Sequence, residues 1–254
     1  MLLAGGGALA LGARGADHRG EPSRRDGVSA ELPQAATPAL RIGTPRPLRD
    51  GPGLSRWAPL RHGVAARARP AAGARVVARL RRLTPEGTSH PLPILGRAVD
   101  ARGRAWLRVS LPVLPNGTGG WIPRRSVGAY ELERSRVVVD LDALTLTLRR
   151  RGRVVFTSRV GVGQDRWPTP RGRFIVRNRL HGYDSSMYGP VAFGTSARSP
   201  RLTDWPAGGF VGIHGTDRPD LLPGRVSHGC IRLRNRDIRR LARLMPVGTP
   251  VIVR

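Results

Sequence analysis

The sequence predicts a mainly β protein of two small domains, and three observations support this fold class. Glycine and proline supply 33 and 23 of the 254 residues and aromatic residues only 5%, a composition that disfavours a large helical bundle. From about residue 73 onward, short apolar runs are separated by turn residues. Several of these runs alternate apolar and polar residues, which is the pattern of half-buried strands.

Charge and hydropathy narrow the class of protein further. All 44 basic residues are arginine, and with 17 acidic residues they give a formal net charge of +27. The arginines are spread through every segment instead of forming a stripe, so the charge favours polyanionic surroundings but does not predict a nucleic-acid partner. No apolar run reaches 18 residues, so no membrane-spanning helix is predicted.

The first 72 residues are predicted to precede the folded part. Residues 1–13 resemble the apolar middle of a secretion signal, but no positively charged leader precedes them. Either the true start lies upstream or the apolar opening is a matter of chance. A signal or anchor here would allow membrane association, and the absence of cysteine excludes a lipidated one. Residues 14–72 are rich in Ala, Arg, Pro and Gly without a sustained period, which predicts a flexible linker.

Residues 73–130 are predicted to form a small β-barrel. Apolar runs occur at 74–80, 91–95, 106–109 and 121–123, and Asn116-Gly117 is a hairpin signal. Trp106 and Trp121 are predicted to lie in its core. The stretch from Trp106 to Gly128 resembles the Src-homology-3-like modules that precede catalytic domains in many secreted wall enzymes.

Residues 131–254 are predicted to form a second, mainly β domain with one helix. Alternating residues predict strands at 137–141, 144–148 and 154–156, with a hairpin turn at 149–153, and further strands at 173–176 and 251–253. The helix is predicted over 236–245, with Asn235 as its cap and with Ile238, Leu241, Leu244 and Met245 on its apolar face.

The single cysteine, Cys230, is the leading candidate for chemistry. It cannot form an intramolecular disulfide, and an unpaired thiol in an exported protein points to a chemical role. Gly229 before it allows a substrate to approach closely. His214 lies 16 positions earlier, and an imidazole that takes the thiol proton and remains as imidazolium would create a nucleophilic thiolate.

Other interpretations of these residues remain open at this point. Cys230 could be a small buried hydrophobe, and His214 and His228 could be hydrogen-bonded structural imidazoles. The same three side chains could bind zinc, although the spacing lacks the usual close ligand pair apart from His228 and Cys230. A non-catalytic wall-binding protein and a basic nucleic-acid binder are the alternatives from other functional classes.

Two motifs extend the case for a cysteine nucleophile. His214-Gly215-Thr216 is followed, after ten residues, by Ser227-His228-Gly229-Cys230-Ile231-Arg232-Leu233, and Thr169-Pro170-Arg171-Gly172-Arg173-Phe174 lies upstream. Together they resemble the signature of L,D-transpeptidase catalytic domains, which cross-link peptidoglycan through diaminopimelate. The resemblance covers about residues 134–253. It implies a β-sandwich catalytic domain, which we expect to span residues 131–254.

The resemblance also implies a role for each matching residue. Cys230 would be the nucleophile and His214 the base, with the carbonyl of Gly215 orienting the imidazole. His228 would shape the site, and Gly229 would allow backbone N–H groups around Cys230 to form the oxyanion hole. Further residues are expected at the substrate cleft: Ser227, Arg232, Tyr183, Met187 and Tyr188.

The implied reaction is an acyl transfer in two steps. A donor tetrapeptide stem would acylate Cys230 with loss of D-Ala, and the side-chain amine of diaminopimelate on a second stem would accept the acyl group. Water as acceptor would make the same site an L,D-carboxypeptidase. The implied partners are peptidoglycan stem peptides, with carbapenem-type β-lactams as inhibitors. Neither a metal nor an organic cofactor is implied, and the expected location is extracytoplasmic, in the cell wall or secreted.

Overall fold

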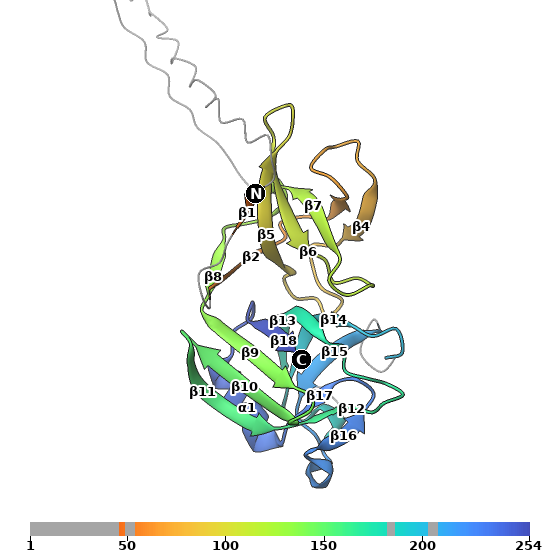
Figure 1. The fold of residues 1–254 in the computed structure, drawn as a ribbon, viewed down its shortest axis with the longest axis vertical. Helices are drawn as coiled ribbons and strands as arrows, with labels where there is room; N and C mark the ends of the chain where they lie inside the picture. The colour runs from red at the N-terminus through yellow and green to blue at the C-terminus, as the bar shows by residue number, and fades with distance from the viewer. Residues whose placement is uncertain (1–45, 49–53, 182–185, 203–207) are drawn as a thin grey trace, which may run out of the picture. The chain divides into compact units, whose positions relative to one another are not determined.

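The computed structural model describes residues 46–48, 54–181, 186–202 and 208–254. The predicted secretion signal at 1–13 lies outside the described residues. The described part is mainly β, which confirms the predicted fold class. Its strands form two sheets (Figure 1).

The first sheet has eight strands, in the order β4-β3-β7-β6-β5-β2-β8 with β1 paired to β5. Adjacent strands pair antiparallel. The strands are β1 (Arg46–Pro47), β2 (Ser55–Pro59), β3 (Val64–Arg67), β4 (Val76–Leu80), β5 (Pro91–Val99), β6 (Ala105–Ser110), β7 (Gly119–Pro123) and β8 (Glu131–Glu133).

The predicted linker is wrong for its last part, because β2 and β3 lie within residues 14–72. Their most deeply buried side chains are Ala58 and Ala66, both fully inaccessible to solvent. Small residues are needed there since, for example, a Cβ on Gly120 would lie 3.0 Å from that of Ala66. Because alanine is also common in linkers, these inward-facing alanines did not show the alternation of large apolar and polar residues that predicts a strand. β8 also extends the first sheet beyond residue 130.

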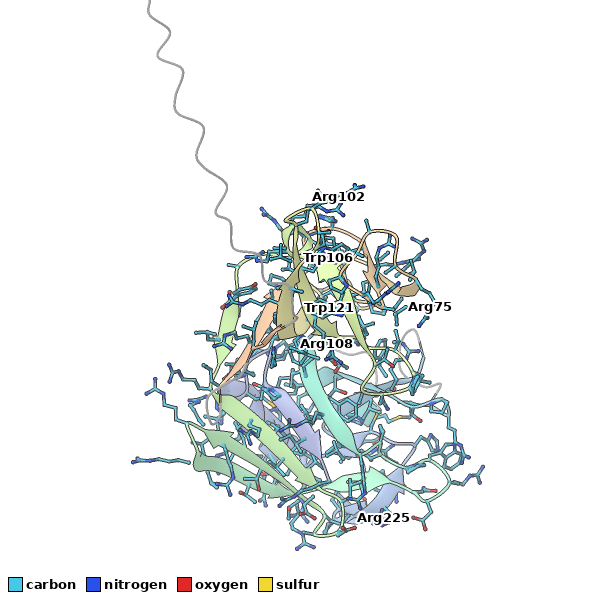
Figure 2. The ribbon with its side chains drawn as sticks, turned by 45° about the horizontal axis from the view of Figure 1, so that its top comes forward. Arg75, Arg102, Trp106, Arg108, Trp121 and Arg225 are labelled. Atoms are coloured by element: carbon cyan, nitrogen blue, oxygen red, sulfur yellow. The ribbon has the colours of Figure 1, made fainter. Side chains whose placement is uncertain are left out.

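The first sheet has its own apolar core. Buried side chains from its strands form one cluster that includes Leu92, Ile94, Leu107 and Ile122. Trp106 and Trp121 are buried in a second, smaller cluster with Ala98, as predicted. Figure 2 shows these two indoles within the sheet, while arginines such as Arg75 and Arg102 lie at its periphery.

The second sheet has ten strands, in the order β11-β10-β9-β18-β13-β14-β15-β17-β12-β16. The last strand in sequence, β18, is parallel to β9 and antiparallel to β13, so it lies inside the sheet. The strands are β9 (Ser135–Asp140), β10 (Thr145–Arg150), β11 (Arg153–Arg159), β12 (Gly161–Gly163), β13 (Gly172–His181), β14 (Val191–Arg198), β15 (Phe210–His214), β16 (Gly224–Ser227), β17 (Ile231–Arg232) and β18 (Pro250–Val253).

The hairpin of β10 and β11 follows from the alternating pattern. Leu146 and Leu148 face the core, and the turn is made by Arg151 and Gly152, whose φ angles are +50° and +84°. Two successive positive φ angles are typical of the tight turns that match strand twist. The predicted strands are therefore correct in this region, but the turn is shorter than the predicted 149–153, because β10 continues to Arg150 and β11 begins at Arg153.

The single α-helix of the described part, α1 (Asn235–Leu244), buries Ile238, Leu241 and Ala242 in the core of the second sheet. In Figure 1 it packs behind that sheet. The predicted cap is wrong: the N-cap residue is Arg234, and no side chain bonds there. Asn235 instead accepts a hydrogen bond at its Oδ1 from the N–H of Thr216, 2.9 Å away, and so fixes the chain after His214.

Candidate active site

Two neighbouring strands place the predicted nucleophile and base together. β15 ends at His214, and β17, which begins directly after Cys230, pairs with it in parallel. The backbone N–H of Gly212 donates a hydrogen bond to Sγ of Cys230 over 3.3 Å. A thiolate accepts such a bond more strongly than a thiol, so this contact favours the reactive form. Nothing in the motif spacing pointed to Gly212.

Both residues line a narrow pocket. Cys230 is only 6% exposed, but its side chain reaches this opening. The full lining is Met187, Tyr188, Leu202, His214, His228, Cys230 and Arg232. Of the residues predicted at the substrate cleft, the structure therefore brings Met187, Tyr188 and Arg232 to the pocket, whereas Tyr183 lies outside the described residues.

His214 is held in one tautomer. Its Nδ1 lies 2.6 Å from the carbonyl oxygen of Gly215, which can only accept, so Nδ1 carries the proton and Nε2 is left with a lone pair. The edge of the Tyr188 ring packs on the imidazole, with 4.9 Å between centroids. Burial lowers the pKa of His214 to about 4, the Gly215 carbonyl opposes this shift, and the positive charge of Arg232 adds to it.

The nucleophile loop is fixed by hydrogen bonds within itself. Ser227 donates its hydroxyl proton to the carbonyl oxygen of Cys230 over 2.6 Å and accepts a bond from the N–H of Gly229 over 3.1 Å. Gly229 has a φ of +120°, which a side chain would disfavour. Ser227 is 1% exposed and is not among the residues that line the pocket, so in this structure its hydroxyl supports the loop, and its contact with substrate stays a prediction.

Thr169, from the upstream Thr-Pro motif, ties this loop to β12. Its hydroxyl donates to the carbonyl oxygen of Gly229 and accepts from the N–H of Gly163, both at 2.9 Å. All three groups are buried. The motif predicted a family likeness, but only the folded chain explains why it lies beside the nucleophile.

The outer part of the site carries a tilted aromatic contact that sequence reasoning missed. The rings of Trp167 and His228 lie 4.3 Å apart, and the guanidinium of Arg166 covers the indole at 3.7 Å. Close by, Nε of Arg232 is buried and finds no hydrogen-bond partner among the described residues.

Within the described ranges, no group of three or more His, Cys, Asp and Glu side chains is arranged to hold a metal ion. His214, His228 and Cys230 are thus not found as such a group in these ranges. In the same part of the chain, no helix is long and apolar enough to cross a membrane.

Comparison with known proteins assigns the second sheet to a family. Residues 134–253 match the model of the L,D-transpeptidase catalytic domain. This segment is an L,D-transpeptidase catalytic domain. The L,D-transpeptidase domain contains the pocket, Cys230 and His214. The match begins after the first sheet, so the likeness of residues 73–130 to Src-homology-3-like modules stays a prediction.

Relatives of the L,D-transpeptidase domain come from several bacteria. The YkuD proteins of Bacillus licheniformis and Bacillus subtilis, named as candidate L,D-transpeptidases, are 38% and 36% identical over 118 and 117 residues. Each match covers 46% of this chain and 64% of the relative. The catalytic domain of the Enterococcus faecium L,D-transpeptidase is 29% identical, with a TM-score of 0.36, over 47% of this chain and 96% of that one.

Proposed function

We propose that this protein is a peptidoglycan L,D-transpeptidase with Cys230 as its nucleophile. The observation that carries the proposal is the pocket in which Cys230 and a singly oriented His214 meet, within a segment that matches the L,D-transpeptidase catalytic domain. A thiol beside an imidazole with a free Nε2 lone pair is the arrangement needed for acyl transfer.

In the first step, Sγ of Cys230 attacks the carbonyl carbon of the L-centre of diaminopimelate in a donor tetrapeptide stem. His214 is neutral before the attack because its pKa is lowered to about 4, so Nε2 takes the thiol proton as the C–S bond forms. The tetrahedral intermediate then breaks its C–N bond, and Nε2 returns the proton to the departing D-Ala. A thioester on Cys230 remains.

In the second step, the side-chain amine of diaminopimelate on an acceptor stem attacks the thioester. His214 accepts a proton from the amine, and the C–S bond breaks to regenerate the thiol. The backbone N–H of Cys230 is the oxyanion donor we assign, because the N–H of Gly229 is already bonded to Ser227. Water in place of the amine would give an L,D-carboxypeptidase, and the two outcomes differ only in the acceptor.

The remaining groups serve binding. Arg232 lines the pocket, and its guanidinium is the group that we assign to pair with a carboxylate of the stem peptide. Met187, Tyr188 and Leu202 supply an apolar wall. We propose an extracytoplasmic location, where the stem peptides lie, and carbapenem-type β-lactams as acylating inhibitors.

Acylation by a carbapenem tests the nucleophile. We expect a stoichiometric adduct in the intact-mass spectrum of the parent, none on Cys230→Ala, and at least about a 100-fold slower reaction for His214→Gln, because a general base contributes roughly that factor. Equal labelling of the parent and Cys230→Ala would defeat the proposal.

Product analysis separates the acceptors. Purified disaccharide-tetrapeptides should give cross-linked dimers with a transpeptidase and trimmed tripeptide stems with a carboxypeptidase. If the protein forms the carbapenem adduct but yields neither of these products, the result would favour the non-catalytic wall-binding alternative.

A further inference from the structure

A buried ion pair joins the first sheet to the L,D-transpeptidase domain. Glu86 lies in the turn between β4 and β5, and its Oε1 is 2.8 Å from NH2 of Arg177 in β13. The two side chains are 4% and 1% exposed. A guanidinium buried this deeply needs a partner, since an uncompensated buried charge is strongly destabilising.

Arg177 also contacts β14 and β15, and β15 is the strand that ends at His214. Its Nε–H donates to the carbonyl oxygen of Thr195 over 2.8 Å, and its guanidinium lies 3.7 Å from the ring centroid of Phe210. The hydroxyl of Thr195 in turn donates to the carbonyl oxygen of Val211 over 2.6 Å. Phe210 and Val211 are the first two residues of β15, the strand that ends at His214.

The second carboxylate oxygen of Glu86 reaches the same strand by another path. Oε2 accepts a hydrogen bond from Nδ2 of Asn178 over 3.0 Å, and Oδ1 of that amide accepts one from the N–H of Gly194, also over 3.0 Å. Gly194 pairs in register with Gly212 of β15. Gly212 is the residue whose N–H contacts Sγ of Cys230.

Both paths therefore begin at one carboxylate and end on β15, the strand that ends at His214 and whose Gly212 contacts Cys230. We propose that Glu86 is a positioning residue for the transpeptidase reaction. Through Arg177 and Asn178 it fixes β14 and β15, and with them the N–H of Gly212 and the imidazole of His214. The first sheet is then a working part of the active enzyme, although it lies outside the matched segment 134–253.

The test uses the full chain and the variant Glu86→Gln. Glu131→Gln is the matched control, because Glu131 is an exposed acid in the same sheet. Two quantities are measured well below the unfolding temperature of each variant: the rate constant for acylation by a carbapenem, and hydrogen exchange of the peptide that spans β15. The inference rests on the proposed function for the first readout only.

For Glu86→Gln we expect acylation to slow about 10- to 100-fold, since small displacements of reacting groups cost this much, and exchange in β15 to rise. The control should match the parent in both. If the contact only stabilises the fold, its loss in Glu86→Gln would lower the unfolding temperature but leave the acylation rate and the exchange in β15 unchanged in the folded protein. That result would overturn the proposal.

A second variant covers the case in which Glu86→Gln does not fold. The double variant Glu86→Leu/Arg177→Met removes both charges, so no buried ion is left unpaired. It should fold and still acylate slowly, because the two paths to β15 are gone. Acylation at the parent rate with parent-like exchange would overturn the inference. A parent that forms no adduct would instead defeat the proposed function, and hydrogen exchange would still decide the positioning role.

Discussion

His214 is a neutral imidazole at pH 7 because of where the fold places it. The sequence led us to expect an imidazolium beside a standing thiolate. The imidazole is 1% exposed, and both its burial and the charge of Arg232 lower its pKa to about 4. Burial disfavours the charged form of a histidine. In the proposed reaction the proton would therefore move as the substrate is attacked, and the N–H of Gly212 would stabilise the charge that develops on Sγ.

This lowered pKa makes stability depend on pH with a defined sign. The unfolded chain binds a proton on His214 below about 6.5, whereas the folded protein binds it only below about 4. Stability is therefore lost as the pH falls from 6.5 to 4, by up to about 3 kcal/mol from this residue. Burial also lowers the pKa of His90, so that side chain adds a contribution of the same sign.

Urea unfolding of the parent and of His214→Gln at pH 7 and pH 4.5 measures this contribution. The variant should lose less stability than the parent between the two pH values. The same loss in both proteins would mean that His214 is not the group that titrates.

At the scale of elements, β12 and the nucleophile loop act as one unit because Thr169 joins them. Replacing this threonine by valine keeps the shape but leaves the buried N–H of Gly163 and the carbonyl of Gly229 without the hydroxyl. Thr169→Val should lower the free energy of unfolding by about 2 kcal/mol and slow acylation of Cys230. Chemical denaturation and adduct formation measure both effects.

Thr169→Ser is the control for that change, since it retains the hydroxyl. It should remain within about 1 kcal/mol of the parent. If the serine variant loses as much stability as the valine variant, the methyl group and not the two hydrogen bonds is what matters.

The elements that the sequence predicted are those whose pattern is local. The alternation of Leu146 and Leu148 and the apolar face of α1 were correct. The structure brings Cys230 and His214 to one pocket, and their catalytic roles stay a prediction. Contacts between distant segments could not be predicted from the sequence. The bond from the Gly212 N–H, the bonds of Thr169 and the tilted contact of Trp167 with His228 join residues that no sequence spacing links. The strands built on Ala58 and Ala66 were missed because their inward residues are small.

At the scale of the whole molecule, the two sheets have separate apolar cores and are linked by a few specific contacts. One of these is the approach of Trp57, in β2, to Gly248, in the turn before β18. A Cβ added at Gly248 would overlap the indole. The contact of Trp57 with the turn before β18 therefore requires glycine at position 248, which has no side chain.

Gly248→Ala tests this contact, with Gly152→Ala as a matched control. The two glycines have φ angles of +89° and +84°, so the backbone strain is the same, about 1 kcal/mol, but the space around Gly152 is open. Gly248→Ala should cost about 2 kcal/mol more in thermal or chemical unfolding. Equal losses would show that Trp57 moves aside freely.

The position of β18 has a consequence for how this protein is made. Residues 250–253 lie between β9 and β13. Until they leave the ribosome, the ten-stranded sheet consists of two unjoined halves, each with a bare row of backbone donors and acceptors. Such rows readily recruit strands from other chains. A nascent or trimmed chain that lacks these four residues should therefore aggregate, because the ten-stranded sheet cannot close without them.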